Sequence, residues 1–268
     1  MIKLFTYKFL HKLRWRLFQS LTLIPRNKDS SISDLFPWVI NDDWETFFDL
    51  TPIIKLFPAC KPLYVEKILI IVFDNNGVQI SSRSYELASI QRTTLKISEF
   101  FETKISGYGT FAVFHLERPE FLKEIGSYIA ERGYTSFSYR ANKIRSYAHG
   151  NLDSVAQLYN GGIEYLGNAS IWRRAYHLQY LFGKSSVAQI ILVNTYKKRL
   201  KYRVKLLNSK TRNEISAETF SIPAGGIAMY SVPEDLTVSV YLVIESRAIM
   251  ARPVVVDYQT QGINIFHG

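Results

Sequence analysis

The sequence predicts a mainly β protein, built from two tandem β-sandwich domains of related topology and preceded by a basic amphipathic helix. Three observations predict this fold. Aromatic residues make up 14% of the 268 residues, and aromatic side chains favour strands. Short apolar runs bounded by turn residues recur along the chain. The second half repeats the order of runs and turns of the first, and two copies of about 100 residues each suit β-sandwiches.

The N-terminal segment is basic and amphipathic. Residues 2–21 contain no proline or glycine and predict a helix. Residues 1–28 hold seven Lys or Arg and no Asp or Glu, within a net charge of +10 for the whole chain. No apolar run approaches the roughly 20 residues that span a bilayer. A helix of this kind can lie on an anionic membrane surface, and the side chains expected to contact lipid are Phe9, Leu13, Trp15 and Leu17.

Two alternatives stay open for this segment. Its apolar stripe could pack on the body of the protein, or the acid-free basic start could be an organellar transit peptide. The chain has one cysteine, Cys60, so no intrachain disulfide indicates an oxidising compartment. We therefore expect a cytoplasmic protein, peripheral at the inner face of the membrane.

The domain plan follows from composition and turn signals. The polar stretch after the helix predicts a linker, and Leu152–Tyr159 predicts a short helix within the segment that joins the two sandwiches. The expected helix, linker, first sandwich, connecting segment and second sandwich are residues 1–25, 26–34, 35–150, 151–170 and 171–268.

Strand signals dominate the body. Lys67–Phe73 is a nearly continuous apolar run, as in a buried strand. Asp74–Gly77 then supplies a turn, and Val78–Leu87 resumes with alternating apolar residues, so the three segments predict a hairpin. Further strands are expected at Thr93–Ile97, Thr110–Leu116, Tyr134–Arg140, Val187–Val193, Leu200–Leu207, Glu218–Ile222, Ile227–Val232, Thr237–Ile244 and Pro253–Tyr258.

The repeat is visible as a match of pattern rather than of identity. Sliding residues 68–97 forward by 135 gives a gap-free match that places, for example, Val72 on Leu207 and Ile97 on Val232. Near the ends of the two copies, Tyr139 matches Tyr258 and the dipeptide His149-Gly150 matches His267-Gly268. The same order of apolar strand, turn, alternating strand, loop and strand therefore occurs twice.

The second copy contains Ile222-Pro223-Ala224-Gly225-Gly226 and then Val243-Ile244-Glu245-Ser246-Arg247, which leads to Pro253-Val254-Val255-Val256. This layout resembles the small β-sandwich family of sensory rhodopsin transducer proteins, over about the last 80 residues and over the first copy only through the repeat. The resemblance implies a sandwich that binds a small ligand or a protein partner and is not an enzyme. The duplication and the N-terminal segment depart from that family, so its partner does not carry over.

The candidate ligand-binding residues lie at the equivalent ends of the copies and at the joint between them. Two histidines at equivalent positions could flank a polar ligand, or each could end a strand in a structural turn. The polar and aromatic joint suits sugars or anions, although it could also be a linker that fixes the two domains. The residues expected at the site are Arg145, Tyr147, His149, Asn151, His267, Tyr139 and Tyr258.

Trp172 to His177 combines aromatic and basic side chains. These residues could contact RNA or phosphate, or they could form an edge strand on which Trp172, Arg174 and Tyr176 share a face. A nucleic-acid partner is not expected, because seven of the ten net charges lie in the N-terminal segment.

No catalytic template is present: the sequence has no nucleophile elbow, phosphate loop, dinucleotide fingerprint or zinc-protease motif. No cofactor or metal is expected. The sequence favours a non-catalytic protein that binds a sugar or protein partner, or acts as a scaffold, beside bacterial surface-glycan or signalling machinery. The alternatives are an enzyme acting on a carbohydrate or phosphorylated substrate at the joint, and a nucleic-acid-binding protein.

Overall fold

The computed structural model describes residues 31–50, 52, 65–87, 92–116, 130–131, 133–140, 144–149, 156–159, 162–184, 186–249, 252–259 and 262–268. This part of the chain is mainly β, as predicted, and its only helical element is a 3-10 turn, η2 (Ile97–Phe100). It contains no helix that is long and apolar enough to cross a membrane. The predicted helix at residues 2–21 lies outside the described residues, as do Cys60 and Asn151.

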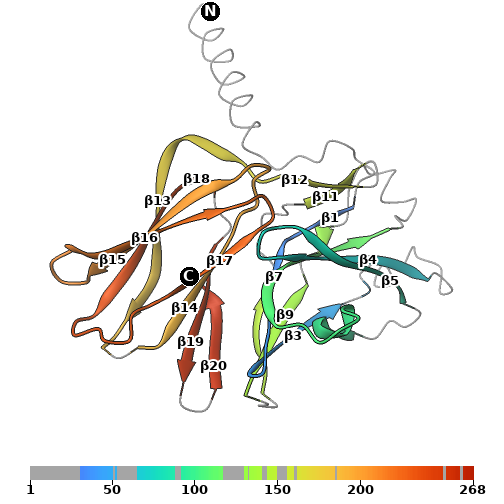
Figure 1. The fold of residues 1–268 in the computed structure, drawn as a ribbon, viewed down its shortest axis with the longest axis horizontal. Coiled ribbons are helices and arrows are strands. Elements are labelled where there is room, and N and C mark those ends of the chain that lie inside the picture. Colours follow the sequence, from blue (N-terminus) through green and yellow to red (C-terminus); the bar gives the residue numbers. More distant parts are fainter. Residues whose placement is uncertain are drawn as a thin grey trace, which may run out of the picture.

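The strands form five four-stranded sheets, each named here after one of its central strands (Figure 1). In sheet order, the β4 sheet contains β2 (Phe36–Ile40), β7 (Gly107–His115), β4 (Glu66–Asp74) and β5 (Gln79–Leu87). The β3 sheet contains β10 (Ser146–His149), β9 (Tyr134–Tyr139), β3 (Trp44–Leu50) and β6 (Thr93–Lys96).

In the second half, the β15 sheet contains β13 (Ala169–Phe182), β18 (Val240–Ala248), β15 (Leu200–Asn208) and β16 (Glu214–Ile222). The β14 sheet contains β17 (Ile227–Ser231), β14 (Ala188–Val193), β19 (Val254–Gln259) and β20 (Gly262–His267). The fifth, the β11 sheet, contains β12 (Gly162–Tyr165), β11 (Ala156–Tyr159), β1 (Ile32–Ser33) and β8 (Ala130–Glu131).

The two halves have the same strand order. Numbered along the chain, the order β2-β7-β4-β5 in the β4 sheet has its counterpart in β13-β18-β15-β16 of the β15 sheet. The order β10-β9-β3-β6 in the β3 sheet likewise has its counterpart in β20-β19-β14-β17 of the β14 sheet. Eight strands in one half therefore correspond in succession to eight strands in the other.

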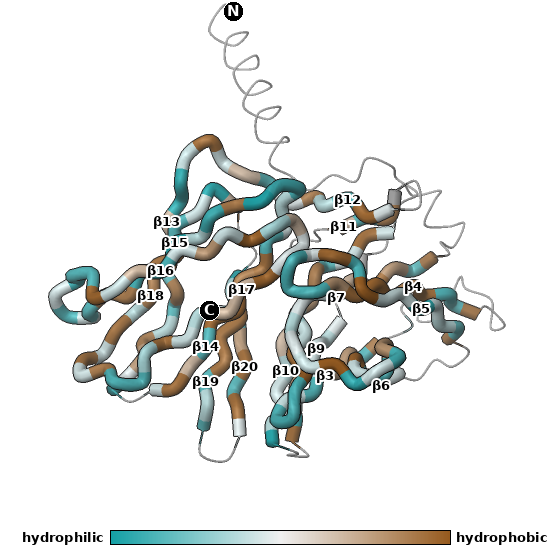
Figure 2. The backbone as a smooth tube through the Cα atoms, viewed as in Figure 1, coloured by the Kyte–Doolittle hydropathy of each residue, from teal (hydrophilic) through white to brown (hydrophobic). Residues whose placement is uncertain are grey.

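The sheets pack face to face in a ring-like series, and each half has its own core. In the first half, Phe48 of the β3 sheet packs with Ile70 and Phe111 of the β4 sheet. In the second half, Ile190 of the β14 sheet packs with Val204 of the β15 sheet. Figure 2 shows the hydrophobic stretches along these strands. Burial of these apolar faces is the main force that holds each pair of sheets together.

The β11 sheet corrects the prediction for the linker and the connecting segment. Ile32 and Ser33, expected in the linker, form β1, and Ala156–Tyr159, expected in a short helix, forms β11. The reason is the outer face of the β4 sheet, where Ile71 and Phe114 are buried against Ala156. The connecting segments are extended because they cover this apolar face.

The gap-free alignment of the halves is wrong by one residue in the first strand. The alignment places Ser81 on Ser216. Val72 is the strand partner of Ser81, and Leu206 is the strand partner of Ser216, so Val72 corresponds to Leu206 and not to Leu207. Val72 and Leu206 are both buried in their cores, whereas Leu207 is half-buried. The β15–β16 turn is one residue longer, because Asn208 N donates to Asn213 O where Asp74 N donates to Val78 O.

The match of Tyr139 with Tyr258 is also displaced by one. His149 pairs with Tyr134, and His267 pairs with Val254, so the two histidines are equivalent in strand pairing. Counting five residues onward from each partner, Tyr139 corresponds to Gln259 rather than to Tyr258.

The halves contact each other through turns as well as sheets. Ile227 N donates to Asn75 O (3.1 Å), and Thr110 Oγ1 donates to Gly225 O (2.7 Å). Gly77 has φ +76°, and a Cβ built on it would lie 2.1 Å from Ala224 O. Only glycine fits this approach of one turn to the other.

Candidate functional site: a groove between the halves

A groove of about 830 Å³ lies between the two halves. Its volume falls within the range of small-molecule sites, which is about 300–1,000 Å³. Its walls come from the β3 and β4 sheets on one side and from the β14 sheet on the other. The residues that carry its chemistry are Asn41, Asp43, Trp44, Tyr108, Tyr139, Arg140, Gln189, Glu234, Tyr258 and Gln259.

Three aromatic rings from both halves meet in this groove. The ring centroids of Trp44 and Tyr139 are 5.3 Å apart, those of Tyr139 and Tyr258 are 5.4 Å apart, and those of Trp44 and Tyr258 are 6.0 Å apart. Trp44 is buried at the base of the cluster, and the two tyrosines are half-buried. Tilted and edge-on rings at these distances attract one another, so the cluster is a fixed apolar surface.

Polar groups fix the cluster from both sides. Tyr258 Oη donates to Gln189 Oε1 at 2.8 Å, and burial raises the pKa of Tyr258 to about 12. The Arg140 guanidinium lies 4.9 Å from the centroid of the Tyr139 ring. Arg140 itself has φ +52°, a conformation that non-glycine residues adopt at a cost and that clusters at functional sites.

The loop after β2 supplies the remaining polar edge. Asn41 Oδ1 accepts hydrogen bonds from the backbone N–H groups of Asp43 and Trp44, both at 2.9 Å. This Asx turn directs the Asp43 side chain to the rim, where it pairs with Arg140 at 4.0 Å. The groove therefore offers an aromatic surface, amide side chains and a cation within one concave site.

The structure separates the sequence-predicted site residues into three places. Tyr139 and Tyr258 line the groove. His149 and His267 contact each other elsewhere, with ring centroids 4.8 Å apart and His267 Nε2 donating to His149 O at 2.7 Å. The cavity beside them measures about 20 Å³, room for about one water molecule.

Arg145 and Tyr147 occupy the third place, at the start of β10, and line neither cavity. The Arg145 guanidinium stacks 4.7 Å from the Phe47 ring centroid, and Tyr147 is 44% exposed. Strand pairing puts Tyr147 and Phe47 on the face of the β3 sheet opposite to Phe48 and the core. A ligand in the groove would not reach them.

Sequence reasoning missed Trp44, Gln189 and Arg140. Gln189 lies in the predicted strand Val187–Val193, but nothing local in the sequence shows that strands of the two halves face each other, and the same holds for Trp44. Arg140 directly follows β9, and its N–H donates to the carbonyl oxygen of Asp43, in the loop before β3, at 2.7 Å. The Asn-Asp-Asp turn at residues 41–43 was the one signal that could have pointed to this edge.

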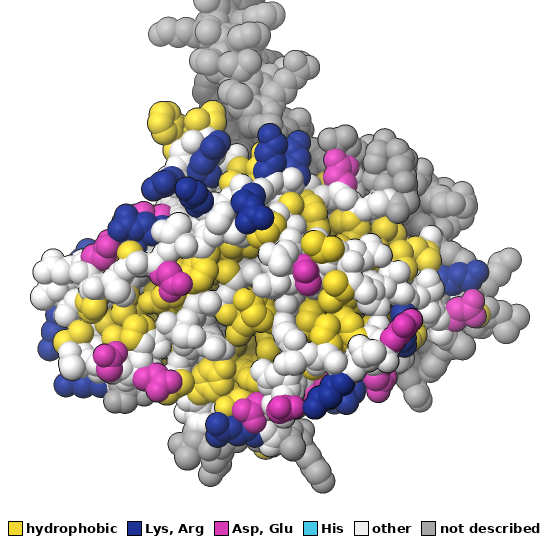
Figure 3. Space-filling view, viewed as in Figure 1, with side chains coloured by type: hydrophobic (Ala, Val, Ile, Leu, Met, Phe, Trp, Pro, Cys, Tyr) yellow, Lys and Arg dark blue, Asp and Glu magenta, His cyan; other side chains and the backbone are white. Residues whose placement is uncertain are grey.

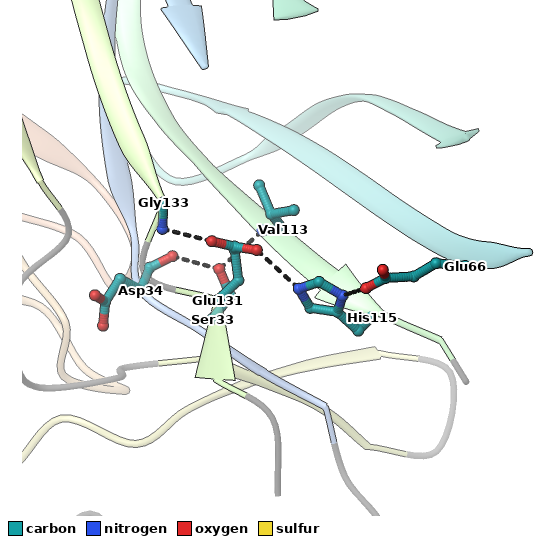
Figure 4. A network of polar contacts seen from close by, with 7 residues as sticks. All are labelled: Ser33, Asp34, Glu66, Val113, His115, Glu131 and Gly133. Carbon is teal, nitrogen blue, oxygen red and sulfur yellow. Dashed lines mark hydrogen bonds and ion pairs between the residues drawn. The ribbon is translucent and has the colours of Figure 1, made fainter. Parts of the chain in front are cut away.

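A second polar cluster is buried rather than open. His115 lies between Glu66 and Glu131, with Nε2 2.7 Å from Glu131 Oε2 and Nδ1 bonded to Glu66 (Figure 4). Burial by itself lowers the pKa of His115, but the hydrogen bonds and charges of the two glutamates outweigh it and raise the pKa to about 9. This charged triad joins β8 to β7 and β4.

The burial and hydrogen bonding of the triad indicate a structural role, in which it links three strands. All three side chains are at most 3% exposed, and Glu131 also accepts a hydrogen bond from Gly133 N. Among the described residues, no group of three or more His, Cys, Asp and Glu is arranged to hold a metal ion.

Comparisons with known proteins give no family. No family model matches the chain, and no curated protein matches it. The resemblance to sensory rhodopsin transducer proteins therefore stays a prediction.

Solved structures match weakly. Infectious bursal disease virus, Gx strain, is 10% identical over 91% of this chain and 60% of that chain, with a TM-score of 0.18. A glycosyl hydrolase family 2 member from Bacteroides cellulosilyticus is 10% identical over 92% of this chain and 30% of that chain, with a TM-score of 0.17. The chain thus spans less than two thirds of either structure, and such TM-scores support no inference.

Proposed function

We propose that this protein is a non-catalytic binding protein whose two halves are copies of one β-sandwich unit, and that it binds a saccharide in the groove between them. The observation that carries the proposal is the aromatic cluster of Trp44, Tyr139 and Tyr258, built from both halves. Sugars present apolar C–H faces and polar edges, and aromatic rings with amide and charged groups match both.

The carboxylates of the groove support a binding role over catalysis. Cleavage of a glycosidic bond needs two carboxyl groups held at a defined separation. Asp43 and Glu234 are the acidic side chains of the groove, come from different halves, and are both exposed at the rim. Two exposed carboxylates on separate walls favour a binding role, because no described contact in the groove holds the pair at a defined separation.

The setting of the proposed function follows from the N-terminal segment. Residues 2–21, with their excess of Lys and Arg, support a peripheral location at the cytoplasmic face of a bacterial membrane, where surface glycans are assembled. This location is part of the proposal and is tested separately from the groove.

The test is a thermal-shift screen of the full chain against a panel of oligosaccharides, followed by calorimetry with any that stabilise it. Tyr139→Ala should weaken binding at least about tenfold, since aromatic side chains dominate such sites. Tyr147→Ala is the matched control, because Tyr147 is an exposed tyrosine on the opposite face of the same sheet.

Two outcomes would contradict the proposal. One is a panel in which no saccharide shifts the melting temperature of the wild-type chain. The other is a loss of binding in Tyr147→Ala with normal binding in Tyr139→Ala, which would place the site at the joint that the sequence predicts.

A further inference from the structure

The edge strand β13 carries a bulge at its N-terminal end. Ala169 pairs with Ala248 and Arg174 pairs with Ser246, so four residues of β13 lie opposite one residue of β18. Arg247 Nε holds the bulge by donating to Ser170 O at 2.9 Å. Residues 170–173 therefore project from the sheet in a defined conformation.

The bulge presents two large apolar side chains to solvent. Ile171 is 80% exposed and Trp172 is 78% exposed, and the two residues are adjacent in the chain. Bulges often protect an edge strand from pairing with another chain, but charged side chains serve that purpose and apolar ones do not. Adjacent exposed Ile and Trp instead mark a contact surface.

Cations surround this pair at the same end of the β15 sheet. Arg173 and Arg174 follow directly in β13, and Lys201 lies near because its carbonyl accepts a hydrogen bond from Ser246 Oγ at 2.9 Å. Gly167 N donates to Thr195 O at 3.0 Å, which brings the loop holding Lys197, Lys198 and Arg199 beside the bulge. Figure 3 shows hydrophobic side chains next to Lys and Arg at this end.

These cations are not neutralised within the described chain. No described carboxylate forms an ion pair with Arg173, Arg174 or Lys201. Farther along the same sheet, Arg203 pairs with Glu214 at 2.9 Å and Lys205 pairs with Glu245. The cations at this end of the sheet are thus available to an anionic partner.

We propose that this tip, made of Ile171, Trp172, Arg173 and Arg174 with the neighbouring cations, inserts into the interface of an anionic lipid bilayer. Tryptophan is enriched at the level of the lipid head groups, and each nearby cation adds attraction to anionic lipid. A nucleic acid could stack on Trp172, but it offers nothing to an isoleucine that is 80% exposed.

The position of the tip fits a two-point attachment. The described chain begins at Ser31, whose carbonyl accepts a hydrogen bond from Leu158 N in β11. β11 is the neighbour of β12, and β12 leads through Gly167 into β13. The basic segment of residues 2–21 precedes Ser31 in the sequence, and stable membrane attachment commonly needs two weak signals.

Brominated-lipid quenching of tryptophan fluorescence tests the proposal in the full chain. The Trp15→Phe variant leaves Trp172 as its exposed tryptophan, since Trp38 and Trp44 are 1% and 6% exposed. With vesicles of phosphatidylcholine and phosphatidylglycerol, its fluorescence should be quenched, and the further change Trp172→Phe should remove the quenching. Unquenched fluorescence on bound vesicles, or no binding to the vesicles, would overturn the proposal.

Flotation with the same vesicles measures the strength of the contact. Arg173→Gln with Arg174→Gln should weaken partitioning about 30-fold, and Ile171→Ser with Trp172→Ala should weaken it roughly tenfold or more. The matched controls lie at the opposite end of the sheet: Lys210→Gln with Arg212→Gln for charge, and Leu181→Ser, at a site 56% exposed, for apolar surface.

The pattern across variants decides between partners. Equal flotation of tip and control variants would overturn the proposal. So would arginine variants that lose binding to a single-stranded RNA oligonucleotide while their flotation stays normal, since the tip would then be a nucleic-acid contact. None of these readouts involves the saccharide groove, so the two proposals fail independently.

Discussion

His267 donates a hydrogen bond from Nε2 to the carbonyl oxygen of His149, its counterpart in the other half, and the two imidazole rings lie 4.8 Å apart. The strands that carry them, β10 and β20, also contact each other through Ile265 N, which donates to Ser146 Oγ at 2.8 Å. Equivalent strand ends of the two halves therefore meet at this point.

This contact predicts a pH-dependent contribution of His267 to stability. Burial lowers its pKa below the usual 6.5. A lowered histidine pKa contributes stability that is present above pH 6.5 and is lost as the pH falls toward the folded-state value. His267→Ala should cost about 1 kcal/mol at pH 7.5 and less at pH 5, by denaturant unfolding. His177→Ala, at an exposed histidine, is the control.

A functional role for the pair would give a different result. If His267→Ala and His149→Ala left the unfolding free energy unchanged at both pH values but abolished ligand binding, the histidines would form a site rather than a structural contact.

The Glu66–His115–Glu131 triad predicts the opposite trend at alkaline pH. The pKa of His115 is raised to about 9, so its contribution is fully present below pH 6.5 and is lost as the pH rises through 9. The shift corresponds to about 3 kcal/mol at most. Urea unfolding at pH 6.5 and pH 9.5 should show this loss in the wild type. A His115→Gln variant with the same loss over that range would contradict the assignment.

Gly77 predicts that the halves are coupled through their turns. Gly77→Ala forces a Cβ to within 2.1 Å of Ala224 O at φ +76°, so we expect a loss of more than about 2 kcal/mol. Gly183→Ala is the control, because its Cβ would meet nothing closer than 3.7 Å. Equal unfolding free energies for the two variants would show that the turns do not hold this contact.

We expect the free energy of unfolding to depend strongly on the buried side-chain amide of Asn194. Its side chain is fully buried, and its Nδ2 lies within 3.0 Å of the carbonyl oxygens of Lys198, Ile222 and Pro223. Asn194→Ala leaves these acceptors without their donor and should cost about 2–4 kcal/mol. Asn213→Ala, at an exposed position, should change stability by no more than about 0.5 kcal/mol.

The strands were predictable where burial leaves a pattern in the sequence. Glu66–Asp74 and Val254–Gln259 are apolar runs, because both faces of these central strands are covered. The equivalence of His149 and His267 was also visible, since it depends only on order along the chain. The one-residue shift that makes Leu206, and not Leu207, the counterpart of Val72 was not visible in the sequence, because turn length changes register without changing the apolar pattern.

The groove and the fifth sheet were not predictable for a related reason. Trp44, Gln189 and Tyr258 come together only when sheets of the two halves pack against each other, and no local signal encodes that contact. Ile32–Ser33 and Ala130–Glu131 are two-residue strands, too short to show any period.

The β11 sheet belongs to the first half and has no counterpart among the described strands of the second. It takes β1 from before the first half, β8 from within it, and β11 and β12 from the segment that leads into the second. An excised first half that ended at Gly150 would lose β11 and β12 and leave Ile71, Phe73 and Phe114 facing water. The first half therefore does not end where the repeat ends. It also needs the connecting segment, which covers the outer apolar face of the β4 sheet.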